Sequence, residues 1–383
     1  MTIHWCGTGL SAIPGLRRLL EAGHDIHVWN RTTAKAESAV GDLTDRISRF
    51  DLDTITDTLQ PNDIVVSMLP GDWHVPLAKA CLFADAHFVS SSYISPEMAT
   101  LDGNARKRGL SFVNEIGLDP GIDHLMAHHL IEDMRSAGVA GPDSDISFLS
   151  YCGGVPKYPN SFCYKFSWSP LGVLKALRAP SRSLHNNAEL RVDRPWNAIT
   201  SFTAPLPKLE TFEVYPNRDS LPFITQYHFD PSWRIRDFVR GTLRLNGWKD
   251  AWADVFSEVE RLETAPDATA EARLREMSDA FWDENAYAPD EPDRVILCVD
   301  LSVENNSIPV WHKTYVMDAW GNARGTAMAR LVSVPLSMAV ESVLNREIPA
   351  GVTPAPHDPK LIARYMDKVN TLAQHLQIVG HLA

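Results

Sequence analysis

The stretch Ile3-His-Trp-Cys-Gly-Thr-Gly-Leu-Ser-Ala12 decides how this chain begins to fold. Residues 3–6 are mostly apolar and predict a short strand, and residues 13–22 have the periodicity of a helix. Between them lies a Gly-x-Gly-x-x-Ala turn, in the strand–turn–helix order of dinucleotide-binding sites. Gly7 permits the tight turn, and Gly9 lets backbone N–H groups approach a pyrophosphate at the helix N-terminus. A plain strand–helix turn is the alternative interpretation.

The end of the second predicted strand, residues 25–29, indicates which dinucleotide binds. An NAD site usually has an acidic residue here, which accepts hydrogen bonds from the ribose. This chain has Asn30-Arg31-Thr32 instead, so a 2′-phosphate is not repelled and the Arg31 guanidinium can bind it. The sequence therefore favours NADP over NAD. A solvated basic start to the next helix is the alternative.

Strands and helices keep alternating as far as residue 114, which is typical of an α/β fold with a parallel, doubly wound sheet. The predicted strands are 63–69, 86–90 and 110–114, and the predicted helices are 73–84 and one that opens at Pro96. Ligands of such sheets bind beyond the carboxyl ends of the strands. Ser90-Ser-Ser-Tyr93 places four hydroxyls there, where they either line a crevice or cap the next helix.

A rigid acidic turn, Asn114-Glu-Ile-Gly-Leu-Asp-Pro-Gly-Ile-Asp-His124, follows the last of these strands. Its three carboxylates stand where an open α/β sheet places its ligand. A simple domain linker is the alternative, since Asp-Pro-Gly is a strong turn signal by itself.

Composition and charge limit the class of protein. A chain of 383 residues is expected to form two or three domains, and 44% hydrophobic residues are typical of a globular protein. The net charge of −12 argues against nonspecific binding to nucleic acid or to an anionic membrane surface. No apolar run is as long as a membrane span, and no signal peptide is recognised. The five scattered cysteines fit reduced thiols in the cytoplasm.

The pattern changes after His124. A helix over 124–137 leads to a strand over 145–151, and the charged segment 248–286 reads as a helical insert between the strands of an α+β domain. Strands over 295–303 and 311–317 return the chain to a sheet, and 325–344 is apolar enough to pack on the first domain. Among His124, His128 and His129, only residues at i and i+4 share a helix face, which gives two possible metal ligands. No third ligand lies at a suitable spacing, so no metal site is expected.

Five motifs in the same order resemble those of the glutamate-forming saccharopine dehydrogenase family, also called saccharopine reductases. The resemblance extends from Gly7 to about residue 247 and rests on Asn114–His124, Phe148–Gly154, Tyr164–Ser169, Tyr215–Ser220 and Arg240–Arg244.

The resemblance implies that saccharopine, water and NADP⁺ interconvert with glutamate, 2-aminoadipate semialdehyde and NADPH. By matching positions it implies cofactor contacts at Thr8, Gly9, Leu10, Ser11, Leu118, Asp119, Pro120 and Ser169. It implies saccharopine contacts at Ser92, Tyr93, Asp119, Arg218, Thr242, Leu243 and Arg244.

The resemblance also implies an organisation into domains and a homodimer. We expect a Rossmann domain over 1–123, completed by 325–383, and a substrate-binding and dimerisation domain over 124–324 with a helical insert at about 232–290. The expected role is lysine metabolism in the cytoplasm.

The reaction needs a proton acceptor, because glutamate attacks the aldehyde only as the neutral amine. Asp119 is the first candidate, with His124 and Cys152 as alternates, although Asp119 can equally anchor the substrate ammonium. Saccharopine has three carboxylates, so Arg218 and Arg244 are expected to converge with Asp119 over the nicotinamide.

Two segments depart from the family pattern: the loop 155–163 and the helical segment after Trp248. If they shape the pocket, the substrate is a related imine, as in reductases of the carboxynorspermidine or homospermidine type. A protein that binds NADP without catalysis is the other alternative.

Overall fold

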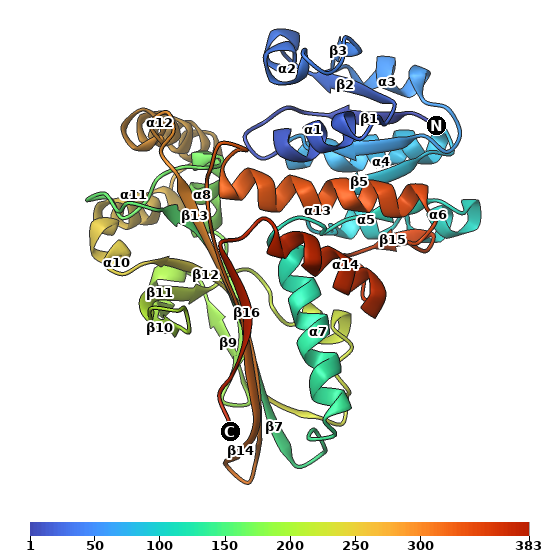
Figure 1. The fold of residues 1–383 in the computed structure, drawn as a ribbon. Coiled ribbons are helices and arrows are strands. Elements are labelled where there is room, and N and C mark those ends of the chain that lie inside the picture. The colour runs from blue at the N-terminus through green and yellow to red at the C-terminus, as the bar shows by residue number, and fades with distance from the viewer. Residues whose placement is uncertain (383) are drawn as a thin grey trace. The chain divides into compact units, whose positions relative to one another are not determined.

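The computed structural model describes residues 1–382 and contains two compact units (Figure 1). Unit 1 comprises Met1–Leu125 and Met328–Leu372, and unit 2 comprises Met126–Ala327 and the tail that starts at Ala373. Unit 1 is therefore discontinuous in sequence. Each unit is described below by itself.

Unit 1 is a Rossmann domain. Its seven strands lie in the order β3-β2-β1-β4-β5-β6-β15 and every neighbouring pair is parallel, which is the doubly wound order with one strand added. This confirms the α/β fold class. The strands are β1 (Ile3–Cys6), β2 (Ile26–Asn30), β3 (Ile47–Arg49), β4 (Ile64–Ser67), β5 (His87–Ser90), β6 (Ser111–Val113) and β15 (Gly351–Thr353).

Helices cover both faces of this sheet, which is why β1 and β4 are buried along their whole length (Figure 1). One hydrophobic core joins the sheet to the helices that follow β3, β4 and β5. The helices of the first stretch are α1 (Ile13–Glu21), α2 (Thr33–Val40), α3 (Leu52–Thr58), α4 (His74–Phe83), α5 (Pro96–Ala99) and α6 (Asp102–Arg108), with a 3₁₀ turn, η1 (Gly71–Trp73), before α4. Helix α7 (Ile122–Ser136) begins in unit 1 and continues into unit 2.

The second stretch adds α13 (Ala327–Leu344), β15 and α14 (Pro359–Asn370) to unit 1. Helix α13 packs on α1, where the Gly15 backbone N–H donates to Ser333 Oγ at 2.8 Å. With a mean hydropathy of 1.4 over 18 residues, α13 is long and apolar enough to cross a membrane, contrary to the expectation that no run is. Because 78% of that window is buried, its apolar residues are accounted for as core.

Unit 2 contains a nine-stranded mixed sheet whose main path is β10-β11-β12-β7-β13-β14-β16. Strands β7 and β12 pair in parallel and the other neighbours on this path are antiparallel, while the β8–β9 hairpin lies beside β12. The strands are β7 (Ser144–Pro156), β8 (Ser181–His185), β9 (Ala188–Val192), β10 (Thr200–Ala204), β11 (Glu210–Pro216), β12 (Arg234–Leu245), β13 (Asp293–Asn305), β14 (Ile308–Trp320) and β16 (His375–Gly380).

The helical insert of unit 2 packs around a cluster of aromatic rings, among them Trp248, Trp252 and Phe256, with Trp248 tilted against Trp252 and edge-on to Phe256. It begins later than the expected 232–290, because residues 234–245 form β12, with apolar side chains in the sheet core. Its helices are α10 (Trp248–Ala251), α11 (Ala253–Glu263) and α12 (Asp267–Asn285), and the other helices of the unit are α8 (Pro170–Leu177), α9 (Pro222–Gln226) and the 3₁₀ turn η2 (Pro195–Ala198).

The C-terminal tail also differs from the expectation. Residues 325–383 were expected to complete the Rossmann domain as a whole, but β16 pairs antiparallel with β14 in the second sheet. The tail from Ala373 therefore belongs to unit 2, while residues 328–372 belong to unit 1.

Candidate active site

The glycine turn of unit 1 has the backbone that its sequence predicts. Gly7 has a φ of +103°, and a Cβ there would lie 2.7 Å from the carbonyl oxygen of Met68, so only glycine fits. The Thr8 N–H donates to Asn30 Oδ1 at 3.2 Å, and Asn30 Nδ2 donates to the Thr32 carbonyl at 2.8 Å. Asn30 thus ties the turn to the segment that was predicted to bind a 2′-phosphate.

Three features of this turn fit a bound dinucleotide. Thr8 Oγ1 is buried without a hydrogen-bond partner among the described residues, and the space around Gly9 is open. Leu10 is 54% exposed, which suits an apolar side chain that a ligand covers. The Arg31 side chain is exposed, and Arg49 of β3 pairs with Asn30 and adds a second cation that the sequence reading missed. Strand pairing, which no local motif signals, brings Arg49 there.

A buried histidine links the ends of β4 and β5. Ser67 Oγ lies 2.8 Å from His74 Nδ1, and Ser92 Oγ lies 2.8 Å from His74 Nε2. Burial lowers the pKa of His74 to about 4, so the imidazole is neutral and one ring nitrogen donates while the other accepts. Ser92 was predicted from the sequence and His74 was not; its only signal was its place at the start of the helix that follows β4.

The acidic turn meets the same strand ends. Tyr93 Oη donates to Asp119 Oδ1 at 3.3 Å, and the Glu115 N–H donates to the Ser92 carbonyl at 3.0 Å. Gly121, with a φ of +147°, is packed so tightly on Gly117 that a Cβ would lie 2.2 Å from its backbone. The structure therefore brings the predicted residues Ser92, Tyr93 and Asp119 together, with Asp119 partly exposed at the rim.

His124 stabilises this turn. Its side chain is completely buried, with Nε2 at 3.2 Å from Glu115 Oε2 and Nδ1 at 3.5 Å from Asp123 Oδ2. Glu115 Oε1 in turn accepts from the Ile94 N–H at 2.9 Å. A ring enclosed by two carboxylates has no surface for a substrate, so the structure does not support His124 as the alternate proton acceptor. Leu118 and Pro120 are buried in the same turn.

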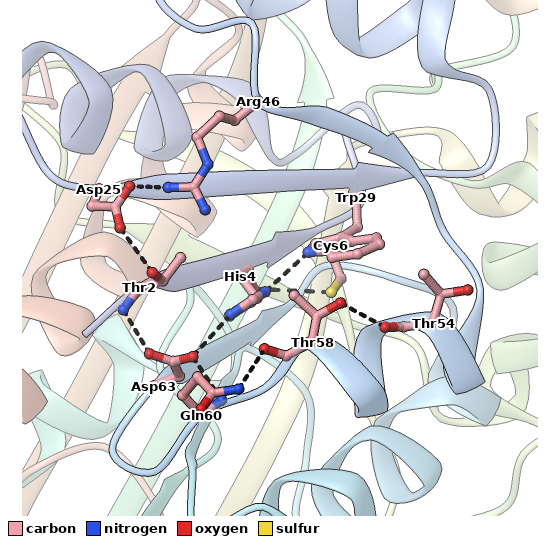
Figure 2. Close-up of polar contacts among 10 residues, drawn as sticks. All are labelled: Thr2, His4, Cys6, Asp25, Trp29, Arg46, Thr54, Thr58, Gln60 and Asp63. Atoms are coloured by element: carbon pink, nitrogen blue, oxygen red, sulfur yellow. Dashed lines mark hydrogen bonds and ion pairs between the residues drawn. The ribbon is translucent and has the colours of Figure 1, made fainter.

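The amino ends of the same strands hold a second buried histidine (Figure 2). His4 Nδ1 accepts from the Trp29 indole at 3.1 Å, so the proton is on Nε2, which lies 3.2 Å from Asp63 Oδ2. Asp63 also accepts from the N–H groups of Thr2 and Gln60, at 2.7 and 2.9 Å. His4 and Asp63 thus have partners within the protein, and the network belongs to the scaffold.

In unit 2, strand pairing aligns three of the predicted residues. Thr242 of β12 pairs with Cys152 of β7 and with Tyr215 of β11, and paired residues lie on one face of a sheet. Arg244 is two residues further along β12 and shares that face. Leu243 points to the opposite face, where it is fully buried in the hydrophobic core, so its side chain is not available to a substrate.

Arg244 is a buried cation in an aromatic cage. It is 6% exposed, and its guanidinium carbon lies 4.9 Å from the ring centre of Tyr164, 5.3 Å from that of Trp248 and 5.7 Å from that of Tyr215. Its Nε is buried without a hydrogen-bond partner among residues 1–382. A desolvated guanidinium with an unused donor is suited to bind a carboxylate.

The remaining predicted residues of unit 2 have other surroundings. The motif 240–244 lies inside β12, and the Arg240 guanidinium carbon lies 4.0 Å from the ring centre of Phe223. Arg218 is exposed in the loop after β11, with a φ of +56°. Ser169 Oγ accepts from the Gly172 N–H at 3.2 Å and so caps α8. Because Asp119 belongs to unit 1, its convergence with Arg218 and Arg244 stays a prediction.

Comparisons with known proteins bear on both units. Residues 3–113 match the family profile "Saccharopine dehydrogenase NADP binding domain", and residues 117–372 match "Saccharopine dehydrogenase C-terminal domain". The chain is 28% identical to saccharopine dehydrogenase (NADP(+), L-glutamate-forming) of Schizosaccharomyces pombe over 434 aligned positions, which cover 94% of this chain and 95% of that one.

Solved structures agree with this match. The apo histidine-tagged saccharopine dehydrogenase (L-Glu forming) of Saccharomyces cerevisiae superposes with a TM-score of 0.80 at 25% identity, over 100% of both chains. Homospermidine synthase of Legionella pneumophila, in complex with NAD, gives a TM-score of 0.66 at 12% identity, over 99% of this chain and 91% of that one. The second likeness shows a shared fold alone.

Proposed function

Since this chain belongs to the saccharopine dehydrogenase family, we propose that it interconverts saccharopine, water and NADP⁺ with L-glutamate, 2-aminoadipate 6-semialdehyde and NADPH. It is an NADP-dependent oxidoreductase that acts on a CH–NH group. The relatives named above cover the whole chain and both units, so the assignment does not rest on the cofactor half alone.

The observation that carries the substrate assignment is the Arg244 cage. A guanidinium that is buried, and whose Nε has no partner among the described residues, is costly to the protein by itself. A substrate carboxylate can offset that cost through a charge-assisted hydrogen bond. Saccharopine has three carboxylates, which suits a site built around such a cation.

The residues of unit 1 position the reacting nitrogen in this proposal. NADP⁺, when bound at the glycine turn, would supply the acceptor for the hydride on the carbon of the C–N bond, and water would hydrolyse the resulting imine to aldehyde and amine. Asp119, held by the Tyr93 hydroxyl, either takes the proton from the substrate nitrogen or anchors an ammonium. Cys152, on the sheet face of Thr242, is the alternate acceptor.

Arg244→Ala tests the substrate site. We expect the KM for saccharopine to rise about a hundredfold, because a charge-assisted hydrogen bond is lost. The Kd of NADP, measured by fluorescence titration, should change less than twofold. Arg182→Ala is the matched control, since Arg182 of the same unit already pairs with Asp219 at 2.7 Å. An unchanged KM in Arg244→Ala would remove this residue from the site.

A related imine substrate is the second candidate, because the fold is shared with a homospermidine synthase. Polyamine substrates are cationic and have at most one carboxylate, so the caged Arg244 favours saccharopine. Incubation of the protein with saccharopine and NADP⁺, while reduced nicotinamide absorbance is followed, separates the two. Activity with a polyamine imine and none with saccharopine would make the polyamine imine the preferred candidate substrate.

We further propose a homodimer formed through unit 2 and a cytoplasmic location. The five cysteines are all free thiols, which fits a reducing compartment. Light scattering after size-exclusion chromatography tests the dimer, and a monomer at micromolar concentration would exclude it. Cell fractionation tests the location.

A further inference from the structure

The Ser67–His74–Ser92 chain has features that a scaffold contact does not need. Both ring nitrogens of His74 lie 2.8 Å from a hydroxyl, and the two hydroxyls differ in exposure. Ser67 is completely buried, whereas Ser92 is partly exposed, beside Tyr93 and Asp119. The series of hydrogen bonds therefore begins at a buried hydroxyl, Ser67, and ends at a solvent-accessible hydroxyl, Ser92, in the candidate site.

A neutral imidazole fixes what the Ser92 hydroxyl can do. If Nε2 accepts the Ser92 hydrogen, the Ser92 oxygen can only accept from a ligand; if Nε2–H donates to Ser92, the hydroxyl hydrogen is left to donate. Ser67 occupies the other nitrogen and can donate or accept there, so both nitrogens are hydrogen-bonded in either tautomer. His74 also restricts Ser92 to one side-chain rotamer.

We propose that His74 is a positioning residue, which acts through Ser92 to orient the polar end of the substrate beside Asp119. The inference rests on the proposed function and extends it to a residue that does not itself touch the substrate. It requires that loss of His74 and loss of Ser92 have the same effect on substrate binding.

Two isosteric variants separate the two nitrogens of His74. The Gln amide can place a polar atom near the Nε2 position and keep the contact with Ser92, whereas the Asn amide reaches only the Nδ1 position and keeps Ser67. We expect His74→Asn and Ser92→Ala each to raise the KM for saccharopine about tenfold, as for one lost hydrogen bond to a ligand, and His74→Gln to stay within threefold of the wild type. The double variant His74→Asn/Ser92→Ala should be no worse than Ser92→Ala.

The outcomes distinguish this inference from the proposed function. If the wild type has no activity on saccharopine, the proposed function fails, and the inference fails with it. If Ser92→Ala raises the KM but His74→Asn does not, or if the two effects multiply in the double variant, only the inference is overturned. Thermal unfolding of each variant identifies a general loss of folding, which would lower kcat and cofactor binding together.

A second and independent inference concerns the edge of the unit 2 sheet. Asp300 of β13, His312 of β14 and His381, just after β16, offer ligand atoms that all lie within 4.8 Å of one another. The two imidazole rings stack at 4.0 Å between centres. His312 Nε2 lies 2.7 Å from Asp300 Oδ2, and His381 Nε2 lies 2.7 Å from Thr314 Oγ1, which itself contacts Asp300 Oδ2 at 2.5 Å.

Three adjacent strands hold this cluster in place. Asp300 pairs with Thr314 across β13 and β14, and the His381 N–H donates to the His312 carbonyl at 3.1 Å. Asp300 and His312 are half-buried and His381 is exposed, so an ion can enter from solvent. Two imidazoles and one carboxylate are the ligand set that Zn²⁺ and similar ions prefer, with water in the fourth position.

The geometry points to a divalent transition-metal site formed by Asp300, His312 and His381, separate from the candidate active site residues. No metal site was predicted from the sequence, because these ligands lie far apart along the chain and only the pairing of three strands brings them together. Hydrogen bonds within the cluster would be exchanged for bonds to the metal.

Titration of the untagged full chain with Zn²⁺, followed by calorimetry, tests the site, and Co²⁺ supplies a visible absorption band of tetrahedral coordination. We expect one ion per chain, with at least a tenfold weaker affinity in His312→Ala, His381→Ala and Asp300→Asn. His185→Ala is the matched control, because His185 pairs with Asp237 at 3.1 Å outside the cluster. No saturable binding, or equal losses in the control and the cluster variants, would overturn the site.

Discussion

Unit 1 contains two buried histidines at opposite ends of one parallel sheet, and their partners differ. His4, at the amino ends of the strands, lies between the Trp29 indole and the Asp63 carboxylate, and all of these groups are buried (Figure 2). His74, at the carboxyl ends, lies between two hydroxyls, of which Ser92 is partly exposed. Burial lowers the pKa of His4, as it does that of His74.

The difference shows that burial and a lowered pKa do not identify a functional residue. The amino-end network satisfies its own donors and acceptors, so it can only stabilise the fold. The carboxyl-end chain leaves one hydroxyl available, at the edge where parallel sheets bind their ligands. The four tests below examine this contrast, from the largest expected effect to the smallest.

Gly7→Val should abolish NADP binding and leave the sheet folded. The new side chain would meet the Met68 carbonyl at a distance that real Cβ atoms do not show, and the φ of +103° is strained for any other residue. Titration with NADPH fluorescence measures the loss. Gly23→Val is the matched control: Gly23 also has a positive φ but has open space around it, and this variant should bind the cofactor normally.

Asp63→Ala should reduce stability by about 3 kcal/mol, because donors around a buried carboxylate lose their acceptor. It deprives His4 and two backbone N–H groups of their acceptor. Urea denaturation measures the loss, and KM values of the folded protein should match the wild type. A raised KM with normal stability would show that the amino end takes part in binding and would undo the contrast.

Acid should destabilise the folded chain through His74. With a folded pKa of about 4 and an ordinary value of 6.5, the unfolded state binds the proton first as the pH falls. The stability that the neutral ring contributes is complete above pH 6.5. It is lost as the pH falls from 6.5 to about 4, and the total loss is about 3 kcal/mol. Urea denaturation at several pH values should show that the free energy of unfolding falls less steeply with acid in His74→Gln than in the wild type. The same dependence on pH in both proteins would contradict the neutral, buried imidazole.

Arg31→Ala should reduce the preference for NADP over NAD about tenfold, which corresponds to about 1.4 kcal/mol from one exposed cation. Ratios of kcat/KM for the two cofactors measure it. Arg49→Ala, from the neighbouring strand, should have a similar effect if both cations contact the phosphate. Equal losses for both cofactors would indicate a folding defect instead.

Local patterns predicted unit 1 well. Its strands and helices are encoded by short-range periodicity, and its first turn by two glycines. The elements β1, α1 and β4 to β6 therefore lie within a few residues of their expected positions. The hydroxyls of Ser92 and Tyr93 were also found, because they directly follow a strand end. His74 and Arg49 were missed, since their roles depend on which strands pair.

Unit 2 was less predictable for a physical reason. Its motifs become neighbours through long-range pairing, such as that of Thr242 with Cys152, which no periodicity reveals. Alternation along β12 also separates Leu243 from Thr242 and Arg244, a distinction that matching motifs cannot make. The cluster of Asp300, His312 and His381 forms only when three strands are in register, so no spacing in the sequence reveals it.

The discontinuity of unit 1 has a consequence for its biosynthesis. Strand β6 receives its outer neighbour, β15, only after residues 126–327 of unit 2 have been translated. Until then a nascent chain leaves the edge of β6 unpaired and the surface of α1 without α13, which exposes it to aggregation and to chaperones on the ribosome. A stalled or truncated product that ends before residue 328 should therefore accumulate as insoluble material, although its nucleotide-binding turn is complete.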